Sequence, residues 1–199
     1  MKLEVLRVEP DGVRWLTPGP RKHSCQLTID TNTMHRKLKL SEDNKTLTYE
    51  GDELQPYPDH PDRFEYFHNV LCETPLTGRC YWEVEWRGGV DISVSYRRIR
   101  RKGDSRACVF GENDHSWCLI YADYKECYVR HNDVKTRLPC SSFSHRVGVY
   151  VDYPAGILSF YKVSSDSLTQ IYTYKTTFTE PLYAGFGLWI SGSKLVLKN

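Results

Sequence analysis

Apolar residues recur at every second position along much of this chain. In the segment Tyr81–Trp86, the apolar side chains Trp82, Val84 and Trp86 alternate with two glutamates. This alternation is typical of an antiparallel strand with one buried and one solvated face. Val90–Tyr96 and Val147–Val151 repeat the pattern, and no window of a dozen residues sustains a capped helical period. The chain is therefore predicted to be all-β.

Turn residues separate the predicted strands. Arg87-Gly88-Gly89 predicts a hairpin between the first two segments, and Asp152–Gly156 predicts a reversal into Ile157–Tyr161, because Pro and Gly supply the backbone angles that turns need. Thr31–Arg36 has room for a turn or two of helix at most. Many short strands at regular spacing predict a two-layer antiparallel sandwich. Further strands are expected at Gln26–Ile29, Lys37–Leu40, Thr46–Tyr49, Cys118–Tyr121, Glu126–Arg130, Val134–Leu138, Gln170–Tyr174 and Leu182–Leu188.

One proline-rich segment divides the chain into a shorter and a longer part. Gln55–Pro61 carries three prolines, which cannot take part in regular ladder pairing, so this segment is predicted to be a connector. The part before it is too short to hold a core of its own. We therefore expect residues 1–199 to form a single domain.

Charge and cysteine content narrow the possible partners. The net charge is only +2, which argues against nucleic acid, and no apolar stretch approaches the roughly 20 residues needed to span a bilayer. We expect no contact of this domain with a membrane. Seven cysteines without any C-x-x-C pair argue against a structural metal. Several lie within apolar runs, so we expect free buried thiols in a reducing compartment rather than a disulfide framework.

Five segments together resemble the PRY-SPRY (B30.2) family. Leu27–Asp30 with Leu38–Asp43 resembles its PRY half, and Gly78–Glu85 resembles its Trp-Glu-Val-Glu motif. Val147–Tyr161 and Phe178–Tyr183 are similar to its later strands. The resemblance implies a jelly-roll-like β-sandwich in which a PRY segment of about residues 13–60 completes one sheet and a SPRY segment of about residues 61–199 supplies the rest.

The resemblance also implies a function. Members of the family bind a protein or peptide target through variable loops, without catalysis or a cofactor. The local sequence of this chain is most similar to that of fish members of the family. These members occur at the C-termini of tripartite-motif ubiquitin ligases, NOD-like receptors and stonefish-type toxins. We expect the cytoplasmic sensing domain of an innate-immune ligase or receptor. The alternatives are the C-terminal domain of a secreted pore-forming toxin, and a butyrophilin-like binder of a small anionic ligand.

Enzyme motifs are missing from the sequence. The P-loop, dinucleotide-binding, G-x-S-x-G and H-E-x-x-H patterns do not occur. Asp59, His60 and Asp62 form the most enzyme-like cluster, but flanking prolines predict a polar surface connector. Neither catalytic nor metal-binding residues are therefore predicted.

The candidate contact residues lie in predicted loops and at strand ends. Arginine forks pair with anionic groups, and a tryptophan in a loop is a frequent hot-spot anchor. The alternatives are a solvated basic loop and a tryptophan folded back on the sandwich. The predicted partner-binding residues are Arg97, Arg98, Arg100, Arg101, Tyr124, Trp189 and Tyr66.

Alternation predicts which side chains of the expected strand Cys118–Tyr121 and its neighbours face the core. Trp117, Leu119 and Tyr121 are expected in the core, together with Trp82 and Trp86. Cys118, Ile120 and Ala122 are then expected to face outward.

Overall fold

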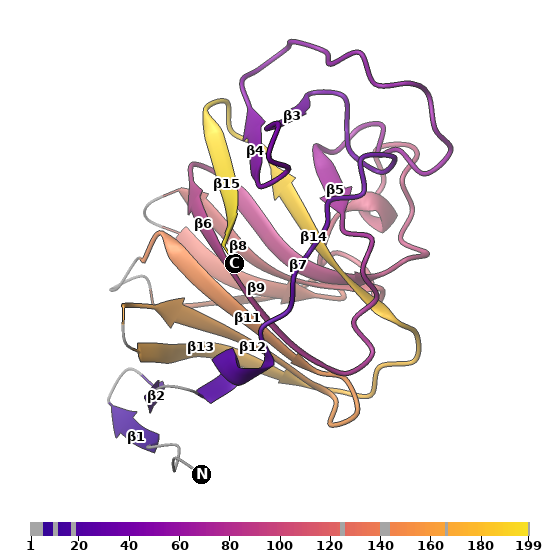
Figure 1. Ribbon diagram of the computed structural model, residues 1–199. Helices are drawn as coiled ribbons and strands as arrows, with labels where there is room; N and C mark the ends of the chain where they lie inside the picture. The colour runs from indigo at the N-terminus through magenta and orange to yellow at the C-terminus, as the bar shows by residue number, and fades with distance from the viewer. Residues whose placement is uncertain are drawn as a thin grey trace.

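The computed structural model describes residues 6–9, 12–16, 19–123, 126–139, 144–165 and 167–198. Strands dominate it, as predicted, and the only helical segments among these residues are two short 3-10 turns (Figure 1). The elements in chain order are β1 (Leu6–Glu9), β2 (Gly12–Leu16), η1 (Gly19–His23), β3 (Leu38–Leu40), β4 (Thr46–Tyr49), β5 (Asn69–Leu71), β6 (Arg79–Arg87), β7 (Val90–Tyr96), η2 (Arg106–Cys108), β8 (Ser116–Asp123), β9 (Glu126–His131), β10 (Val134–Arg137), β11 (Arg146–Asp152), β12 (Ile157–Val163), β13 (Ser167–Lys175), β14 (Leu182–Leu188) and β15 (Ser193–Lys198).

The described strands form two antiparallel sheets that face each other. The larger has the order β1-β2-β13-β12-β11-β6-β15-β4-β3, and the smaller has the order β10-β9-β8-β7-β14-β5. The early strands β2, β3 and β4 all join the larger sheet, as expected for a PRY segment that completes one sheet. The two-layer sandwich is therefore confirmed.

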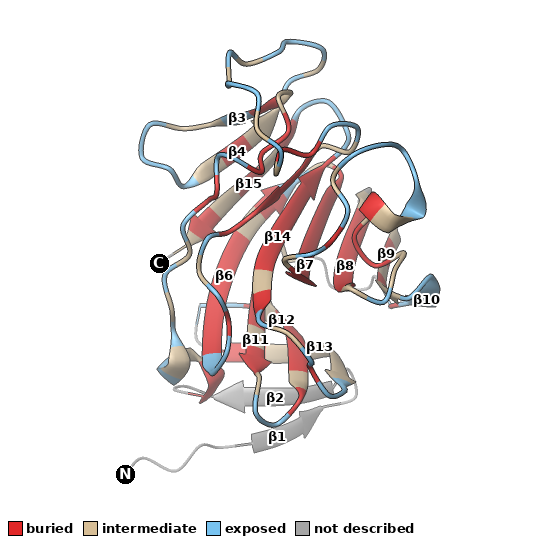
Figure 2. Cartoon of the chain, turned by 90° about the vertical axis from the view of Figure 1, so that its right-hand side faces the viewer, coloured by how far each residue is buried: buried red, intermediate tan, exposed pale blue. Residues whose placement is uncertain are grey.

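The main core lies between the two sheets. It includes the three tryptophans that the alternation assigned to it, Trp82, Trp86 and Trp117, each 3% exposed. The Trp86 ring of the larger sheet stacks on Tyr121 of the smaller one, with ring centroids 4.0 Å apart. In Figure 2 the central strands, among them β6, β7 and β14, are red along most of their length, while exposed residues gather mainly in the connecting loops.

A second apolar layer covers the outer face of the smaller sheet. Cys118 and Ile120 of β8 point away from the main core, as predicted, but they are 0% and 1% exposed. They pack against Phe64, Ile99 and Phe110 from long loops. The expectation that they form an outer surface is wrong, because alternation along a strand cannot show that a loop covers its second face.

Two short connections have different outcomes. Gly88 and Gly89 do not form a hairpin, because β6 pairs with β11 and β15 whereas β7 pairs with β8 and β14. They instead carry the chain from one sheet to the other. The predicted reversal at Gly156 is confirmed: β11 pairs antiparallel with β12, and Gly156 has a φ of 67° beside the Thr176 carbonyl, where a side chain would clash.

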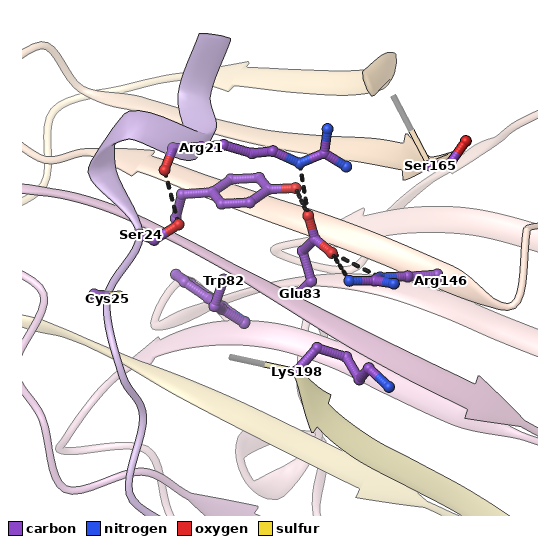
Figure 3. A pocket seen from close by; sticks show the side chains of 9 residues that line it. Arg21, Ser24, Cys25, Trp82, Glu83, Arg146, Ser165 and Lys198 are labelled. Carbon is purple, nitrogen blue, oxygen red and sulfur yellow. Dashed lines mark hydrogen bonds and ion pairs between the residues drawn. The ribbon is translucent and has the colours of Figure 1, made fainter. Parts of the chain in front are cut away.

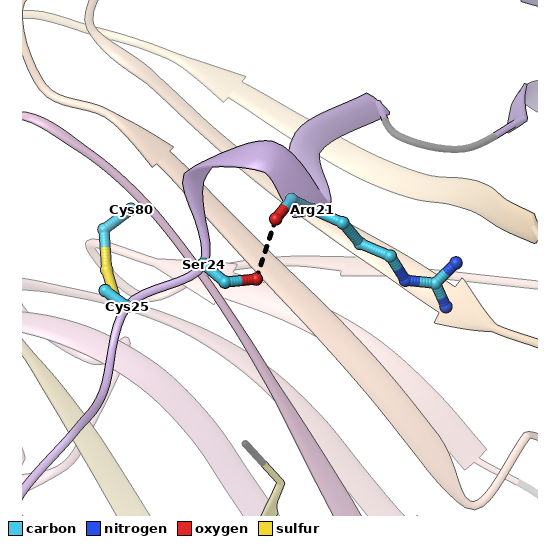
Figure 4. Close-up of a disulfide and its surroundings, with 4 residues drawn as sticks. All are labelled: Arg21, Ser24, Cys25 and Cys80. Carbon is cyan, nitrogen blue, oxygen red and sulfur yellow. Dashed lines mark hydrogen bonds between the residues drawn. A yellow bond between two sulfur atoms is a disulfide. The ribbon is translucent and has the colours of Figure 1, made fainter.

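Cys25 and Cys80 form a disulfide, which corrects the expectation of free thiols at these two positions (Figure 4). The Cys25 amide donates to the Tyr81 carbonyl at 2.9 Å, and this contact places the two Cα atoms 5.5 Å apart. The bridge closes a loop of 55 residues, for which chain entropy predicts a stabilisation of at most about 4 kcal/mol. Cys72, Cys108 and Cys118 are free and buried, as expected. Cys127 is also buried, and Cys140 lies outside the described residues.

The expected strand at Gln26–Ile29 is wrong. Only Ile29 makes an isolated bridge, to Cys72, and the neighbouring residues run as an extended loop. The remaining predicted strands are present with small shifts at their ends. No helix among the described residues is long and apolar enough to cross a membrane.

Candidate functional site

Two of the surface hollows that contain charged side chains differ in how those charges are matched. The first, of about 360 Å³, lies on the outer face of the larger sheet beside η1 (Figure 3). Its central group is the Glu83 carboxylate of β6. Arg21 Nε donates to Glu83 Oε1 at 3.0 Å, Arg146 Nε donates to Oε2 at 2.6 Å, and the Tyr81 hydroxyl donates to Oε1 at 2.7 Å.

This network is closed on itself. Burial alone would raise the pKa of Glu83, but the hydrogen bonds from Tyr81 and Arg21 and the charge of Arg146 outweigh it and leave the pKa below its ordinary value. Figure 3 shows the two guanidinium groups reaching Glu83 from different sides of the hollow. Each central charge already has a partner, so we interpret this network as a structural connection between η1, β6 and β11 rather than as a binding site.

The second hollow, of about 280 Å³, lies on the smaller sheet and has mostly apolar walls. β5, β7, β8, β9 and the segment after β14 each contribute to it, so strands rather than loops fix most of its wall. The residues that line it are Phe67, His68, Asn69, Asp91, Val109, Ile120, Tyr128, Arg130, Leu188 and Trp189.

Trp189 forms one wall of this hollow and keeps part of its ring in solvent. Its side chain is held in place because Nε1 donates to Asp91 Oδ1 at 3.2 Å, yet the residue remains 42% exposed. The Trp189 ring is thus held against the sandwich and is also accessible to solvent. A fixed, half-exposed ring loses little side-chain entropy when it is covered by a partner.

Asp91 and Arg130 supply the charges at this site. Burial raises the pKa of Asp91 to about 7, and Arg130 acts in the opposite direction. Arg130 pairs with Glu112, while its Nε is buried without a hydrogen-bond partner among the described residues. Burial lowers the pKa of His68, so this ring is neutral at pH 7. The site therefore combines apolar walls with a few fixed polar groups, the usual composition of a binding pocket.

The chemistry of the neighbouring groups favours binding over catalysis. The Cys118 thiol lies behind Ile120, and burial raises its pKa far above the range in which a thiolate forms. In the connector, Asp59 pairs with Arg36 and Asp62 with Arg97, so the carboxylates flanking His60 point to different partners. No group of three metal-binding side chains occurs among the residues that the structure describes.

Arg97 and Arg98 are engaged within the fold. Arg97 pairs with Asp30 at 2.5 Å and with Asp62 at 3.5 Å, and its guanidinium lies 5.5 Å from the centre of the Tyr183 ring. Arg98 pairs with Glu180. Both side chains remain partly exposed, so a partner that docks here would meet guanidinium groups that are already fixed.

Arg100 and Arg101 differ from each other. Arg101 donates to the carbonyls of Arg97 and Ile99, whereas Arg100 is exposed and makes no hydrogen bond or ion pair with any described residue. Tyr66 is 60% exposed and packs against Phe67, which lines the second hollow. Among the described residues, Trp189 lines this hollow, whereas Tyr66 contacts the lining residue Phe67 without lining the hollow itself. None of the four arginines is part of the lining. Tyr124 lies outside the described residues.

Sequence reasoning missed Asp91, Arg130 and Tyr128. Asp91 sits on the polar side of β7, where alternation predicts a solvated face. The loop layer buries Asp91, Ser93 and Ser95 alike. The one sequence feature that could have indicated a site here is the single carboxylate among serines on that face. Arg130 and Tyr128 share one face of β9, and only the register of β8 with β9 brings them beside Ile120.

Comparison with protein families assigns both halves of the chain. Residues 27–76 match the SPRY-associated domain PRY, and residues 79–199 match the SPRY domain. The second match alone covers more than half of the chain.

Relatives and solved structures agree with this assignment. The chain is 39% identical over 178 residues to stonustoxin subunit alpha of Synanceia horrida and 40% identical over 182 residues to tripartite motif-containing protein 16 of Mus musculus. These alignments cover 88% and 87% of the chain but only 25% and 32% of the relatives. The stonustoxin structure superposes with a TM-score of 0.84 at 36% identity, over 92% of this chain and 28% of that one. The TRIM65 PSpry domain superposes with a TM-score of 0.79 at 25% identity, over 90% and 94% of the two chains. Sequence motifs, sheet topology and these matches together show that the chain belongs to the SPRY domain family, with a PRY segment before the SPRY segment.

Proposed function

We propose that this domain recognises a protein or peptide target through the face around Trp189. SPRY domains are typically protein-binding modules. The single observation that carries the proposal for this face is the hollow in which a fixed, half-exposed tryptophan stands over buried Asp91. An aromatic group at the centre of a contact surface, partly desolvated and fixed in position, is the usual form of a binding hot spot.

Two further predicted contact residues, Tyr66 and Arg100, belong to the proposed contact face. Tyr66 extends the apolar surface through its contact with Phe67. Arg100, which has no partner among the described residues, supplies a charge for the rim. A rim charge chiefly accelerates association with an acidic partner, whereas a central ring chiefly slows dissociation.

The test uses a peptide selected by panning a random library against the wild-type domain. Its binding is then measured for Trp189→Ala, Trp189→Phe and Arg100→Ala. Trp189→Ala should weaken binding by about 2 kcal/mol or more through faster dissociation. Trp189→Phe, which keeps a ring but loses the donor to Asp91, should have an intermediate effect. Arg100→Ala should slow association and reduce its dependence on salt.

The matched control is Ile190→Ala, because Ile190 is exposed next to Trp189 but does not line the hollow. It should bind the selected peptide like the wild type. Equal affinities for wild type and Trp189→Ala, with both proteins folded, would show that the target docks elsewhere.

For the parent protein, we propose an innate-immune sensor of the ligase or receptor type, with the domain at its C-terminus. The similarity to tripartite motif-containing proteins 16 and 14 of Mus musculus supports this assignment. Because those relatives carry the matched segment within longer chains, activities of the whole protein depend on its other domains.

A secreted toxin subunit is the second candidate parent, and the Cys25–Cys80 disulfide specifically favours it. Disulfides persist in oxidising compartments, and the subunits of stonustoxin and neoverrucotoxin are among the relatives. Asn44-Lys45-Thr46 is an acceptor sequence for N-glycosylation, and Asn44 is exposed between β3 and β4. In the full-length protein from animal cells, a glycan lost on Asn44→Gln together with an oxidised Cys25–Cys80 pair would assign the secretory route. An unmodified Asn44 and two reduced thiols would assign the cytoplasm.

A further inference from the structure

A row of cationic side chains crosses the outer face of the larger sheet. The strands β3, β4, β15 and β6 are neighbours in this sheet (Figure 2). Lys39 of β3 is opposite Thr48 of β4. Lys194 of β15 lies between Thr48 and Arg87 of β6. Each residue of the row is adjacent in sequence to a residue buried in the main core, so alternation places the row on the outer face. These core residues are Leu38, Leu47, Leu195 and Trp86.

The three cations of this row have no ionic partner within the described part of the chain. The side chains of Lys39, Lys194 and Arg87 make no hydrogen bond or ion pair with any described residue. Glu85 lies two residues before Arg87 on the same face of β6, but it is paired with Lys198 at 3.1 Å and with Arg146 at 3.8 Å. The row therefore presents three positive charges to solvent.

Two of these charges are directly opposite each other. Lys194 and Arg87 are cross-strand partners, and the Cβ atoms of such partners are about 4.5 to 5.5 Å apart. Like charges at this separation destabilise a sheet. A carboxylate placed over both side chains replaces this repulsion by attraction, so the row is complementary to an acidic partner.

A hollow of about 280 Å³ opens beside the row. Val196 and Trp86 give it an apolar wall next to the charges of Arg87 and Lys194. It shares no lining residue with the hollow beside Trp189. An apolar side chain of a partner can therefore be buried here while neighbouring carboxylates reach the row. The residues that line the hollow are Glu85, Trp86, Arg87, His145, Lys194 and Val196.

We propose that this face binds an acidic segment of a protein partner, with carboxylates over Arg87, Lys194 and Lys39 and an apolar side chain in the hollow. Neighbouring strands are about 4.8 Å apart, so the row extends about 14 Å across three strand spacings. An extended segment of about four or five residues covers this distance. The site is separate from the recognition face around Trp189 and does not depend on it.

Two other anionic partners match this face less well. Surfaces that bind membranes insert apolar side chains between the lipids, and no large exposed apolar residue that the structure describes belongs to β3, β4, β15 or β6. Single-stranded nucleic acids stack their bases on aromatic rings, and the row contains no ring. An acidic protein segment needs neither feature.

The test is a titration of the isotopically labelled domain with the peptide Glu-Glu-Glu-Leu-Glu-Glu-Glu at low ionic strength, followed by NMR. Wild type should show saturable shifts of the amides around Lys39, Lys194 and Arg87. A peptide with serine in place of leucine should bind at least about threefold more weakly, because it leaves the hollow unfilled. Arg87→Glu should weaken binding at least about tenfold. This variant should unfold at a temperature no lower than that of wild type, since it turns a like-charge pair into an opposite-charge pair.

The matched control is Arg137→Glu, an identical charge change at an exposed arginine of β10, the edge strand of the smaller sheet. The Arg137 side chain likewise has no partner among the described residues. This variant should bind the peptide within about twofold of wild type. Equal weakening by both arginine variants, or the absence of saturable binding to wild type, would overturn the proposal. Trp189→Ala should bind the acidic peptide like wild type, so a failure of this proposal is separable from a failure of the recognition face.

A second titration separates an acidic protein segment from an anionic membrane. Vesicles of phosphatidylserine and phosphatidylcholine should not bind the domain under the conditions in which the peptide does. Vesicle binding that Arg87→Glu abolishes, together with no binding of the peptide, would assign this face to a membrane and overturn the proposal.

Discussion

Asp91 is the residue whose surroundings differ most from those that its sequence context predicts. It lies on the polar side of β7, yet it is 9% exposed under the loop layer, and burial raises its pKa from 3.8 to about 7. Between these values the folded protein retains a proton that the unfolded chain has released. Stability contributed by Asp91 therefore falls as the pH rises from about 4 to about 7, and it is constant above that range.

The corresponding prediction concerns Asp91→Asn, which removes the titration but keeps an oxygen that accepts from Trp189 Nε1. Relative to wild type, the variant should gain about 2 to 3 kcal/mol of unfolding free energy between pH 5 and pH 8, since one pKa unit corresponds to 1.36 kcal/mol. Urea denaturation at the two pH values measures this difference. The same relative stability at both would mean that Asp91 is ionised in the fold as it is in the unfolded chain.

At the scale of elements, the Glu83 network fastens η1 to the larger sheet. Arg21 belongs to η1, Glu83 to β6 and Arg146 to β11, and the Glu83 side chain is only 9% exposed. Removing one partner of a buried ion pair leaves the other charge uncompensated, which costs about 3 to 5 kcal/mol when both are fully buried. The two arginines are 21% and 39% exposed, so solvent reduces this cost.

Glu83→Gln should therefore destabilise the domain by about 2 to 3 kcal/mol in chemical denaturation. Glu85→Gln is the matched control, because Glu85 lies two residues along β6 and pairs with Lys198 at 3.1 Å but is 42% exposed. It should cost less than about 1 kcal/mol. Equal effects of the two variants would show that the network does not hold η1.

Alternation identified the strands whose two faces differ in polarity, including the fully buried β7, and it failed where the sequence shows no such difference. β6 and β11 alternate clearly and were predicted, whereas Asn69, Val70 and Leu71 of β5 are all buried and show no alternation in three residues. β15 was missed because Val196 interrupts the pattern of Leu195 and Leu197. Three features depend on which distant segments come into contact: the disulfide, the connection between the two sheets at Gly88 and the loop layer over Ile120. The spacing of residues along the chain does not predict such contacts.

The candidate site shows the same division. Trp189 and Tyr66 were predicted as contact residues in loops. Both rings are exposed, and Trp189 lines the second hollow, while Tyr66 packs against the lining residue Phe67. Their role in binding stays a prediction. Arg97 and Arg101 also have roles within the fold that no local pattern reveals, because their partners at Asp30 and Ile99 depend on how the loop folds back. A basic run in a sequence therefore combines residues that hold a loop with residues that remain free for a partner.

At the scale of the whole molecule, the two family segments share one core. β4 of the PRY segment pairs with β15 at the other end of the chain, and β5 pairs with β14. Leu47 of β4 and Val70 of β5 are fully buried in the same cluster as Trp82 and Phe186. Neither segment can therefore bury its apolar face without the other.

We therefore predict that residues 1–199 unfold as a single cooperative unit. Calorimetry should show one transition whose van't Hoff and calorimetric enthalpies agree, at about 140 kcal/mol near 60 °C for a chain of 199 residues. The control is the Pro56→Ala variant, which alters the exposed connector without touching a buried contact and should preserve the single transition. Separate transitions for residues 27–76 and 79–199 would contradict the shared core. Leu47 of the first segment and Phe186 of the second are both fully buried in the folded domain. Because β4 pairs with β15 and β5 pairs with β14, separating the two segments would expose both side chains to water.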